Sequence, residues 1–440
     1  MRSGWQWGPV INDVTGLSHA WRQRLSQYEH IYIGYSGGLD STVLLTMVAA
    51  CPELLQRITA IHVHHGLSSY ADQWFDHCQQ YCQRLGVTYK GIRVGVVPGA
   101  NLEERARVAR YQVFDDFVTT QDALLLAHHQ NDQAETVLLN LLRGTGLDGL
   151  CAMPEQRVCG KGVLLRPLLQ SPRQDVYEYA QRHGLQWIED EMNAASEWSR
   201  GYLRQQIIPL LQVKWPNLVA TVATSAQHCQ QAKKALDAWI ELDCPDLSQL
   251  KLEMTAELLA DTVRCTQVLR AWLKYHGHRS PTHACIQQIL QTVVHAGQDA
   301  MPNVQWEDWQ VRRYRQTLYL VAANASMPQN LVWDNFPEPI AWTDNWFVVA
   351  TPDPVHGTPI SHASRIEVKV RTGGESLHWH GQTQCLKKLF QSWLIPPWDR
   401  TQWPLVYVND QLRVVPDYAQ SDLLLSDDPS ERYTISTYKN

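Results

Sequence analysis

The chain has 440 residues and a formal charge of −6, because 38 Lys and Arg stand against 44 Asp and Glu. Hydrophobic residues make up 44% of the chain and charged residues 19%, a balance that excludes disordered and collagen-like proteins. No apolar run reaches the ~18 residues of a membrane helix, and the first residues lack the apolar core of a secretory signal. We therefore expect a cytoplasmic protein without a membrane partner.

The first part of the chain alternates predicted strands with predicted helices. A helix opens directly after the first strand, and further helices are expected at 68–85, 101–118 and 132–143. The strands that separate them are expected at 31–35, 57–65, 89–97 and 123–129. This alternation predicts a Rossmann-like parallel sheet covered by helices, with a ligand site beyond the carboxyl ends of its strands.

The pattern changes after about residue 215, where helices are expected at 217–243, 255–277 and 281–296. Residues 304–321 alternate as a hairpin does, and a Pro-rich stretch with little periodicity follows. We therefore divide the chain into four parts. These are an α/β catalytic domain (1–215), a mainly helical middle domain ending in the hairpin (216–325), a linker (326–362) and a small α+β carboxy-terminal domain (363–440).

A Gly-rich segment lies between the first strand and its helix. It reads Ser36, Gly37, Gly38, Leu39, Asp40 and Ser41. Glycines let the backbone approach an anion closely, and the free N–H groups of a helix start suit a phosphate. A carboxylate beside phosphates indicates a bound cation, so Asp40 is the candidate Mg²⁺ ligand. The segment predicts nucleotide binding, and an ordinary strand–helix turn is the alternative.

The segment SGGLDS resembles the pyrophosphate loop of the PP-loop (N-type) ATP pyrophosphatases, which cleave ATP between its α- and β-phosphates. Further segments resemble the tRNA(Ile)-lysidine synthetases, and together they cover nearly the whole chain. They are HVHHGLS (62–68), NLEERARVARY (101–111), AHHQNDQAET (127–136), LLRGTGLDGL (141–150), WIEDEMNAASEWSRGYLRQQIIPLL (187–211) and LKKLFQSWLIPPWDRTQWPLVY (386–407). The chain departs from the family pattern at Ser68, Asn131 and Gly201, where Arg, Asp and Asn are usual.

The resemblance implies an ATP- and Mg²⁺-dependent carbon–nitrogen ligase. ATP would adenylate the C2 carbonyl oxygen of the wobble cytidine in a tRNA(Ile) with a CAU anticodon, releasing pyrophosphate. The amine of free L-lysine would then attack C2 and expel AMP. The product, lysidine, pairs with A, so that decoding changes from AUG to AUA and charging from methionine to isoleucine.

Asp132 and Glu135 are three residues apart at a predicted helix start and share one face of that helix. With Asp40 they are the expected catalytic carboxylates, which would hold Mg²⁺, position the lysine ammonium group or accept its proton. The alternative is that the two acids only stabilise the helix dipole.

The candidate contacts to substrate and tRNA are cationic or imidazole side chains: Arg107, Arg110, His129, Arg200, Arg204, Lys387 and Lys388. Guanidinium groups bind phosphates in a bidentate manner, and lysines near the carboxyl terminus suit tRNA phosphates. Ion pairing within a helix is the alternative for Arg107 and Arg110. Five histidines lie at two strand ends: His62, His64, His65, His128 and His129. They could hydrogen-bond phosphates or a base, or only close the strand ends, and the family resemblance explains them without a zinc site.

Three other functions stay open at this point. The first is a PP-loop tRNA thiolase, for which Cys78 and Cys82 have a helical spacing although the chain has no CxxC pair. The second is a small-molecule amide synthetase, and the third is a nucleotide-binding regulator without catalysis. The assembly is also open, with a homodimer as one candidate.

Overall fold

The computed structural model describes residues 11–12, 16–66, 70–95, 99, 102–189, 199–297, 300–324, 326–361, 364–423 and 432–439. The chain divides into two compact units, residues 1–239 and 240–440. In the part that the model describes, no helix is long and apolar enough to cross a membrane.

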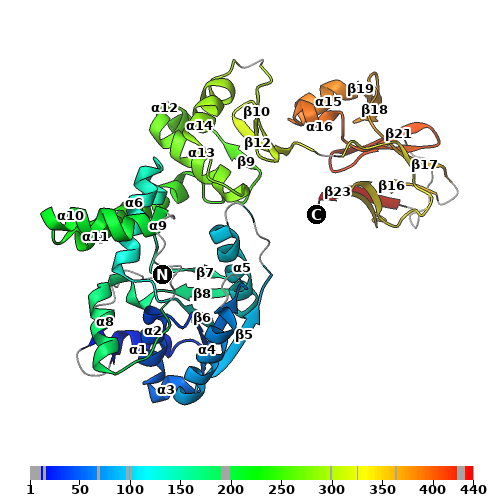
Figure 1. Ribbon diagram of the computed structural model, residues 1–440. Coiled ribbons are helices and arrows are strands. Elements are labelled where there is room, and N and C mark those ends of the chain that lie inside the picture. Colours follow the sequence, from blue (N-terminus) through cyan, green and yellow to red (C-terminus); the bar gives the residue numbers. More distant parts are fainter. Residues whose placement is uncertain are drawn as a thin grey trace. The chain divides into compact units, whose positions relative to one another are not determined.

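The first unit contains the predicted parallel sheet (Figure 1). Its strand order is β5 (Thr88–Arg93), β4 (Ile58–His64), β3 (His30–Gly34), β6 (Asp122–Leu125), β8 (Gly162–Leu165) and β7 (Gln156–Cys159). The first five strands are parallel, which confirms the predicted fold class. Strand β7 is antiparallel to β8, and this hairpin was not predicted.

Helices cover both faces of this sheet. Successive residues of β3 point to opposite faces of the sheet. Ile31 and Ile33 enter the buried cluster on one face, and Tyr32 packs against the buried cluster on the other face. Five α-helices contribute side chains to the first cluster: α1 (His19–Leu25), α2 (Leu39–Ala49), α3 (Pro52–Leu55), α4 (Ala71–Leu85) and α8 (Arg173–Arg182). Helix α5 (Leu102–Phe117) covers the opposite face through Val113 and Phe114.

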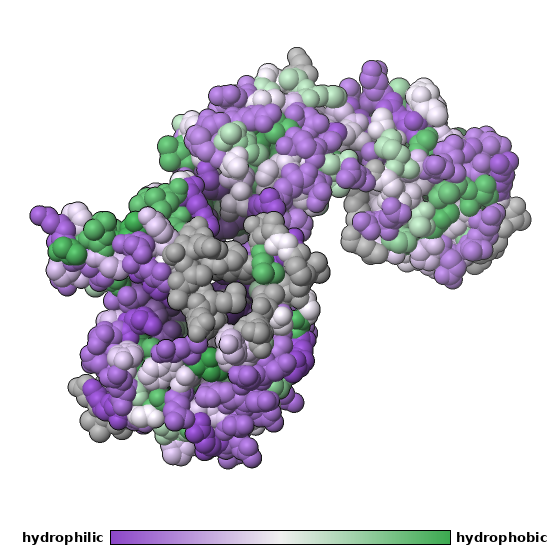
Figure 2. Space-filling view, viewed as in Figure 1, coloured by the Kyte–Doolittle hydropathy of each residue, from purple (hydrophilic) through white to green (hydrophobic). Residues whose placement is uncertain are grey.

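Helices also end the first unit. Helix α6 (Gln130–Leu142) follows β6, and Ala134 packs against Ile208 and Val219 of two later helices. Those helices are α10 (Ile208–Lys214) and α11 (Leu218–Asp243), preceded by α9 (Ser199–Tyr202) and a π-helical turn, η3 (Leu203–Ile207). Apolar side chains also reach the surface on α10 and α11, including Leu210 and Leu242 (Figure 2).

The compact unit extends beyond the predicted domain end at residue 215. The Gln230 amide of α11 donates to the carbonyl oxygens of Cys151 at 2.7 Å and Met153 at 3.1 Å. These bonds hold α11 on the first unit, so the division falls after residue 239.

The second unit contains helices in the region where they were expected. They are α12 (Ala256–Ala260), α13 (Thr262–His276) and α14 (His283–Ile289), which continues into a π-helical turn, η4 (Leu290–Val294). The helix predicted at 255–277 is interrupted at Asp261, whose carboxylate caps α13 by accepting from Val263 N at 2.9 Å. The predicted hairpin belongs to a four-stranded antiparallel sheet: β10 (Asn303–Trp306), β11 (Trp309–Tyr314), β12 (Thr317–Ala322) and β9 (Lys251–Glu253).

The expected linker at 326–362 is wrong, because this segment forms strands of the last domain. Strand β13 (Leu331–Val332) pairs with β17 (Ile366–Lys369), and β15 (Trp346–Pro352) pairs with β14 (Ile340–Thr343) and β23 (Arg432–Lys439). The physical reason is burial: Trp333, Trp342 and Trp346 fill the core between these strands. Because the segment is rich in proline, its buried apolar residues were not recognised as belonging to strands.

The carboxy-terminal domain contains both helices and strands, as predicted, and is mainly β. Two short helices, α15 (Leu386–Ser392) and α16 (Pro397–Arg400), accompany its strands. Its remaining strands are β16 (Thr358–Pro359), β18 (Ser376–Trp379), β19 (Gln382–Cys385), β20 (Leu405–Val408), β21 (Gln411–Val415) and β22 (Ala419–Gln420).

Candidate active site

The Gly-rich segment forms a tight loop between β3 and α2. Ser36 and Ser41 hold it together, because their hydroxyl oxygens lie 3.0 Å apart and the Ser41 hydroxyl donates to the Gly38 carbonyl at 3.0 Å. Gly38 is the N-cap of α2 and its N–H donates to Ser36 Oγ at 3.3 Å. The loop therefore presents serine hydroxyls and a helix N-terminus together, as a phosphate site requires.

Gly37 fits the loop because it lacks a side chain. Its φ is +84°, and a Cβ at this position would lie 2.6 Å from Ile188 Cδ1 and 2.8 Å from Cys78 Sγ. The Ile188 N–H also donates to the Gly37 carbonyl at 2.9 Å, which ties the loop to the segment after α8. Cys78 and Cys82 are buried core residues, and burial raises the pKa of both thiols. They are therefore held as protonated thiols.

A cavity of about 650 Å³ opens beside the loop, which is ample for a nucleotide. Its lining combines the loop with side chains from α5, α6, α8, α9 and η3. The polar side chains are Ser36, Asp40, Ser41, Arg107, Arg110, Tyr111, His128, Asp132, Arg173, Glu189, Arg200, Arg204 and Gln205. Arginines thus surround a loop that is built for anions.

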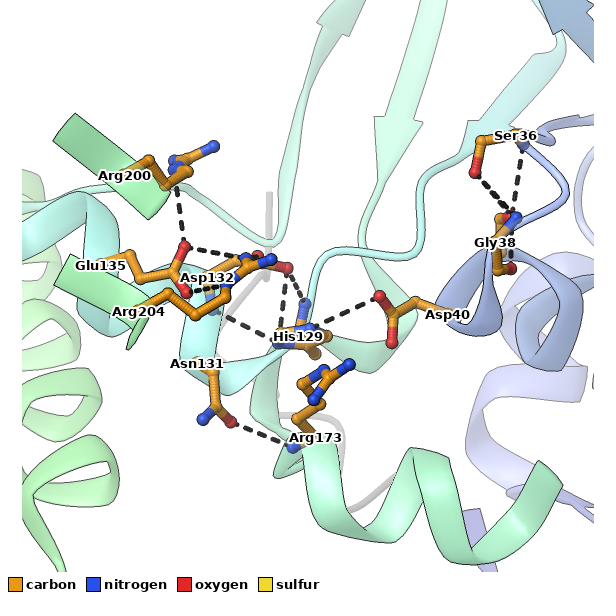
Figure 3. A network of polar contacts seen from close by, with 11 residues as sticks. Ser36, Gly38, Asp40, His129, Asn131, Asp132, Glu135, Arg173, Arg200 and Arg204 are labelled. Carbon is orange, nitrogen blue, oxygen red and sulfur yellow. Dashed lines mark hydrogen bonds and ion pairs between the residues drawn. The ribbon is translucent and has the colours of Figure 1, made fainter. Parts of the chain in front are cut away.

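His129 joins the loop to the predicted carboxylates (Figure 3). Its Nε2 lies 3.6 Å from Asp40 Oδ2, and its Nδ1 accepts from the Asp132 N–H at 3.3 Å. Asp132 Oδ2 accepts in return from the His129 N–H at 3.0 Å, so the two residues cap α6 reciprocally. Burial opposes a charge on His129, but the hydrogen bond to Asp40 and the charges of Asp132 and Asp40 raise its pKa.

Burial alone would also raise the pKa of Asp132. The positive charge of His129 and the His129 N–H outweigh it and hold the pKa of Asp132 below its usual range. Asp132 is therefore a stable carboxylate at the cavity wall.

Glu135 is almost fully buried, at 1% side-chain exposure, and is not among the cavity-lining residues. Arg204 donates to both of its oxygens, from Nε at 2.7 Å and from Nη2 at 3.0 Å. Arg204 Nη2 also donates to Asp132 Oδ1 at 3.0 Å, and Arg200 Nε lies 3.5 Å from Glu135 Oε2. Glu135 thus anchors two arginines whose side chains line the cavity (Figure 3).

Asn131 links the starts of two helices. Its Oδ1 accepts from the N–H of Arg173, the first residue of α8, at 3.0 Å. Figure 3 shows the Arg173 side chain extending toward Asp40 and His129. The amide therefore supplies the acceptor that a carboxylate would supply in its place. Gly201 lies in α9, and Ser68 is outside the described residues.

The structure brings together most of the predicted site residues. Arg107 and Arg110 line the cavity from α5, and Arg107 also forms an ion pair with Glu104 at 3.3 Å, so its contact with a substrate stays a prediction. Lys387 and Lys388 belong to the other compact unit, where they are exposed on α15.

Sequence reasoning missed several cavity residues, among them Arg173, Trp187, Glu189 and Gln205. The proline before Arg173 marks a helix start, which was the one local signal for it. Trp187, Glu189 and Gln205 had no such local signal, because only the folded chain brings them to the cavity.

A magnesium ion fits the loop side of the cavity. Asp40 Oδ1 is buried and accepts no hydrogen bond from the described residues, so an acceptor is left for a cation. No group of three or more potential ligands from His, Cys, Asp and Glu occurs in the described ranges. Magnesium is typically held by one or two carboxylates together with substrate phosphates, so Asp40 fits this ion.

Comparisons with known proteins cover nearly the whole chain. Three families match: the PP-loop domain over residues 13–211, the TilS substrate binding domain over 258–319 and the TilS substrate C-terminal domain over 366–436. A protein of Legionella pneumophila (strain Paris) named tRNA(Ile)-lysidine synthase is 43% identical over 95% of this chain and 98% of its own length. A protein of the same name from Coxiella burnetii is 38% identical over 90% of both chains.

Solved structures give weaker likenesses. The U34-tRNA thiolase NcsA from Methanococcus maripaludis matches with a TM-score of 0.40 and 20% identity, over 47% of this chain and 74% of its own. This likeness is too weak to indicate a shared function.

Proposed function

Because the chain belongs to the tRNA(Ile)-lysidine synthase family, we propose that it attaches free L-lysine to C2 of the wobble cytidine of a CAU-anticodon tRNA(Ile). It is an ATP-using enzyme of the PP-loop class. ATP adenylates the C2 carbonyl oxygen and pyrophosphate leaves. The lysine ε-amine then attacks C2, the C2–oxygen bond breaks, and AMP departs with that oxygen.

One observation carries this proposal. The phosphate loop, the carboxylate of Asp132 and the guanidinium groups of Arg200 and Arg204 line the same cavity. Phosphate oxygens need the loop and the arginines, whereas an ammonium group needs a carboxylate. A reaction that joins ATP, a nucleobase and an amino acid uses both kinds of group in one place.

We assign separate roles to the carboxylates. Asp132 lines the cavity and its pKa is low, so it suits contact with the lysine ammonium group. Glu135 is buried behind Arg204 and Arg200 and acts as their anchor. Arg204 and Arg200 then present guanidinium donors to phosphate oxygens.

Asp40 would hold Mg²⁺ through its free Oδ1 atom. A magnesium ion neutralises the charge that develops on the leaving pyrophosphate. Asp40 also faces His129, whose Nε2 lies 3.6 Å from Asp40 Oδ2, so His129 holds this carboxylate in place.

Lys387 and Lys388, which belong to the second unit, contribute affinity for tRNA phosphates. We place the enzyme in the cytoplasm, where ATP and tRNA are available. A homodimer stays a prediction, which sedimentation equilibrium of the full chain tests directly.

Product analysis tests the proposed function. The purified chain is incubated with ATP, Mg²⁺, labelled lysine and the CAU-anticodon tRNA(Ile), and the RNA is digested to nucleosides. Label in lysidine together with AMP formation supports the proposal. If AMP is released but the acceptor is not this tRNA, the proposed substrate is wrong. If ATP binds and no AMP forms, the protein is a nucleotide-binding regulator. Cys78→Ser/Cys82→Ser with full activity excludes the thiolase alternative, since neither buried thiol would then be needed.

A further inference from the structure

Arg166 is a buried guanidinium group whose partners among the described residues are a backbone carbonyl, an imidazole and the side chain of Tyr111. It follows β8 and is only 4% exposed. Its Nη1 donates to the Pro154 carbonyl at 2.6 Å and its Nε donates to His128 Nδ1 at 3.2 Å. Among the described residues, no carboxylate forms an ion pair with it. Burying a guanidinium group without a carboxylate is costly, so its position needs an explanation.

The contact with His128 fixes the state of that imidazole. A guanidinium N–H can only donate, so His128 Nδ1 must carry a lone pair. A neutral imidazole with a lone pair on Nδ1 carries its proton on Nε2. No described residue makes a hydrogen bond to Nε2, and His128 lines the cavity. The Nε2–H group is therefore left for a ligand.

The surroundings of His128 also keep it neutral. Arg166, Arg200 of α9 and Arg110 of α5 face it with positive charge, and Asp132 of α6 faces it with negative charge. Burial and the arginines outweigh Asp132 and lower the pKa of His128 to about 3. Its neighbour His129 is driven in the opposite direction. The pKa values of these two adjacent histidines are thus shifted in opposite directions.

We infer that His128 is a neutral Nε2–H donor to a substrate oxygen, and that Arg166 is the positioning residue that fixes and polarises this donor. The inference rests on the proposed function for the identity of the substrates. The arginines on the same wall of the cavity can only donate hydrogen bonds, so the substrate atom that reaches this wall is an acceptor. That acceptor is a phosphate oxygen of ATP or the C2 oxygen of cytosine. The role resembles that of an oxyanion-hole donor.

The state of His128 can be observed without any reaction. The full chain is labelled with ¹⁵N-histidine, and long-range ¹H–¹⁵N correlation spectra are recorded from pH 5 to 8, with His128→Gln used to assign the signals. We expect the Nε2–H tautomer of His128 with no titration in this range. Titration in Arg166→Met but not in Arg157→Met supports the pairing, because exposed Arg157 lies over Tyr111 and makes no bond to His128. An Nδ1–H tautomer, or titration of wild-type His128 near pH 6.5, would overturn it.

Kinetics show whether Arg166 acts through His128. Arg166→Met should lower AMP formation about tenfold in the wild-type background. It should have no further effect in the His128→Ala background, because residues that act together are not additive. Equal losses in both backgrounds would give Arg166 a separate structural role and overturn the inference. His128→Gln, whose amide N–H reaches the position of Nε2, should retain more activity than His128→Asn, whose shorter amide reaches only the position of Nδ1. This comparison stands if Arg166→Met does not fold.

ATP affinity measured without tRNA identifies the acceptor. Weaker ATP binding in His128→Asn assigns a phosphate oxygen, whereas unchanged binding with slower AMP formation assigns the cytosine oxygen. If Arg166→Met leaves lysine transfer unaffected, the inference about Arg166 and His128 is contradicted, whereas the proposed function is not. AMP release without lysine transfer would contradict the proposed function and leave the Arg166–His128 pairing intact.

Discussion

Arg204 binds the buried carboxylate of Glu135 through two parallel hydrogen bonds, Nε to Oε1 at 2.7 Å and Nη2 to Oε2 at 3.0 Å. Bidentate geometry of this kind fixes a guanidinium plane as well as its position. The plane of Arg204 at the cavity wall is therefore set from behind by a residue that does not itself reach the cavity.

Arg204→Ala should lower the free energy of unfolding by about 1–2 kcal/mol, because it removes the main partner of a buried carboxylate. This loss is smaller than for a fully buried ion pair, because the Arg204 side chain is 40% exposed to solvent and Arg200 stays near Glu135. Urea denaturation measures the loss, and exposed Arg143→Ala is the control. Adding Glu135→Gln to Arg204→Ala should cost little more, and fully additive losses would contradict the pairing.

Asp40→Ala should reduce AMP formation by roughly 100-fold or more while tRNA affinity stays near that of the wild type. The substitution removes the carboxylate whose free oxygen is proposed to hold Mg²⁺ beside the phosphate loop. Steady-state AMP formation and filter binding of tRNA check the two halves of this prediction. Asp76→Ala, which removes an exposed charge of α4, should change neither. Loss of tRNA binding with normal AMP formation would refute the role of Asp40.

Gly37→Ala should be destabilising by about 1–2 kcal/mol for its left-handed backbone alone, with a further loss from packing. The new methyl group would displace Ile188 and Cys78. Gly184→Ala is a matched control, because Gly184 also has a positive φ, +57°, but nothing lies within 4 Å of its Cβ position. Gly37→Ala should lower the melting temperature and the ATP affinity more than Gly184→Ala does. Equal effects at the two positions would show that the packing around Gly37 is unimportant.

His129→Asn should change how stability depends on pH. The pKa of His129 is raised on folding, so its contribution is fully present below the unfolded pKa of about 6.5 and is lost as the pH rises through the raised value. Asparagine keeps an N-cap for α6, so the substitution removes mainly the titratable imidazole. The stability difference between wild type and His129→Asn, from urea denaturation, should be larger at pH 6 than at pH 9. A difference that grows with pH would mean that His129 is neutral in the folded chain.

Lys387→Ala/Lys388→Ala should weaken tRNA binding and leave ATP affinity unchanged, because both side chains are exposed on α15 in the second unit. If each contacts a phosphate, the slope of log K against log salt becomes less steep by roughly one to two. Titration of tRNA at several salt concentrations measures this slope. Lys161→Ala, an exposed lysine of the first unit, is the control. An unchanged slope would place tRNA elsewhere on the chain.

The sheet and the loop were predictable because their signals are local. Ile31 and Ile33 precede SGGLDS, and the helix begins at Leu39, so one short window contains strand, loop and helix start. The linker was misread for the opposite reason. Trp342 and Trp346 are buried by β23, about ninety residues further along, and no local window contains that partner.

The site was only partly predictable. Asp132 and His129 lie in one helix start, and their reciprocal cap follows from local spacing. Arg166 reaches His128 because β8 pairs with β6, where Leu165 lies opposite Leu125. Glu135 was expected in the chemistry, but its burial behind Arg204 depends on packing that sequence spacing does not contain.

Isotope tracing tests the central claim, adenylation of the C2 oxygen, most directly. A tRNA(Ile) carrying ¹⁸O at C2 of the wobble cytidine is incubated with the enzyme, ATP, Mg²⁺ and lysine, and AMP is examined by mass spectrometry. The account predicts one ¹⁸O atom in each AMP released with lysidine and none in pyrophosphate. Lysidine formed with unlabelled AMP would contradict it, because the C2 oxygen would then have left by another route.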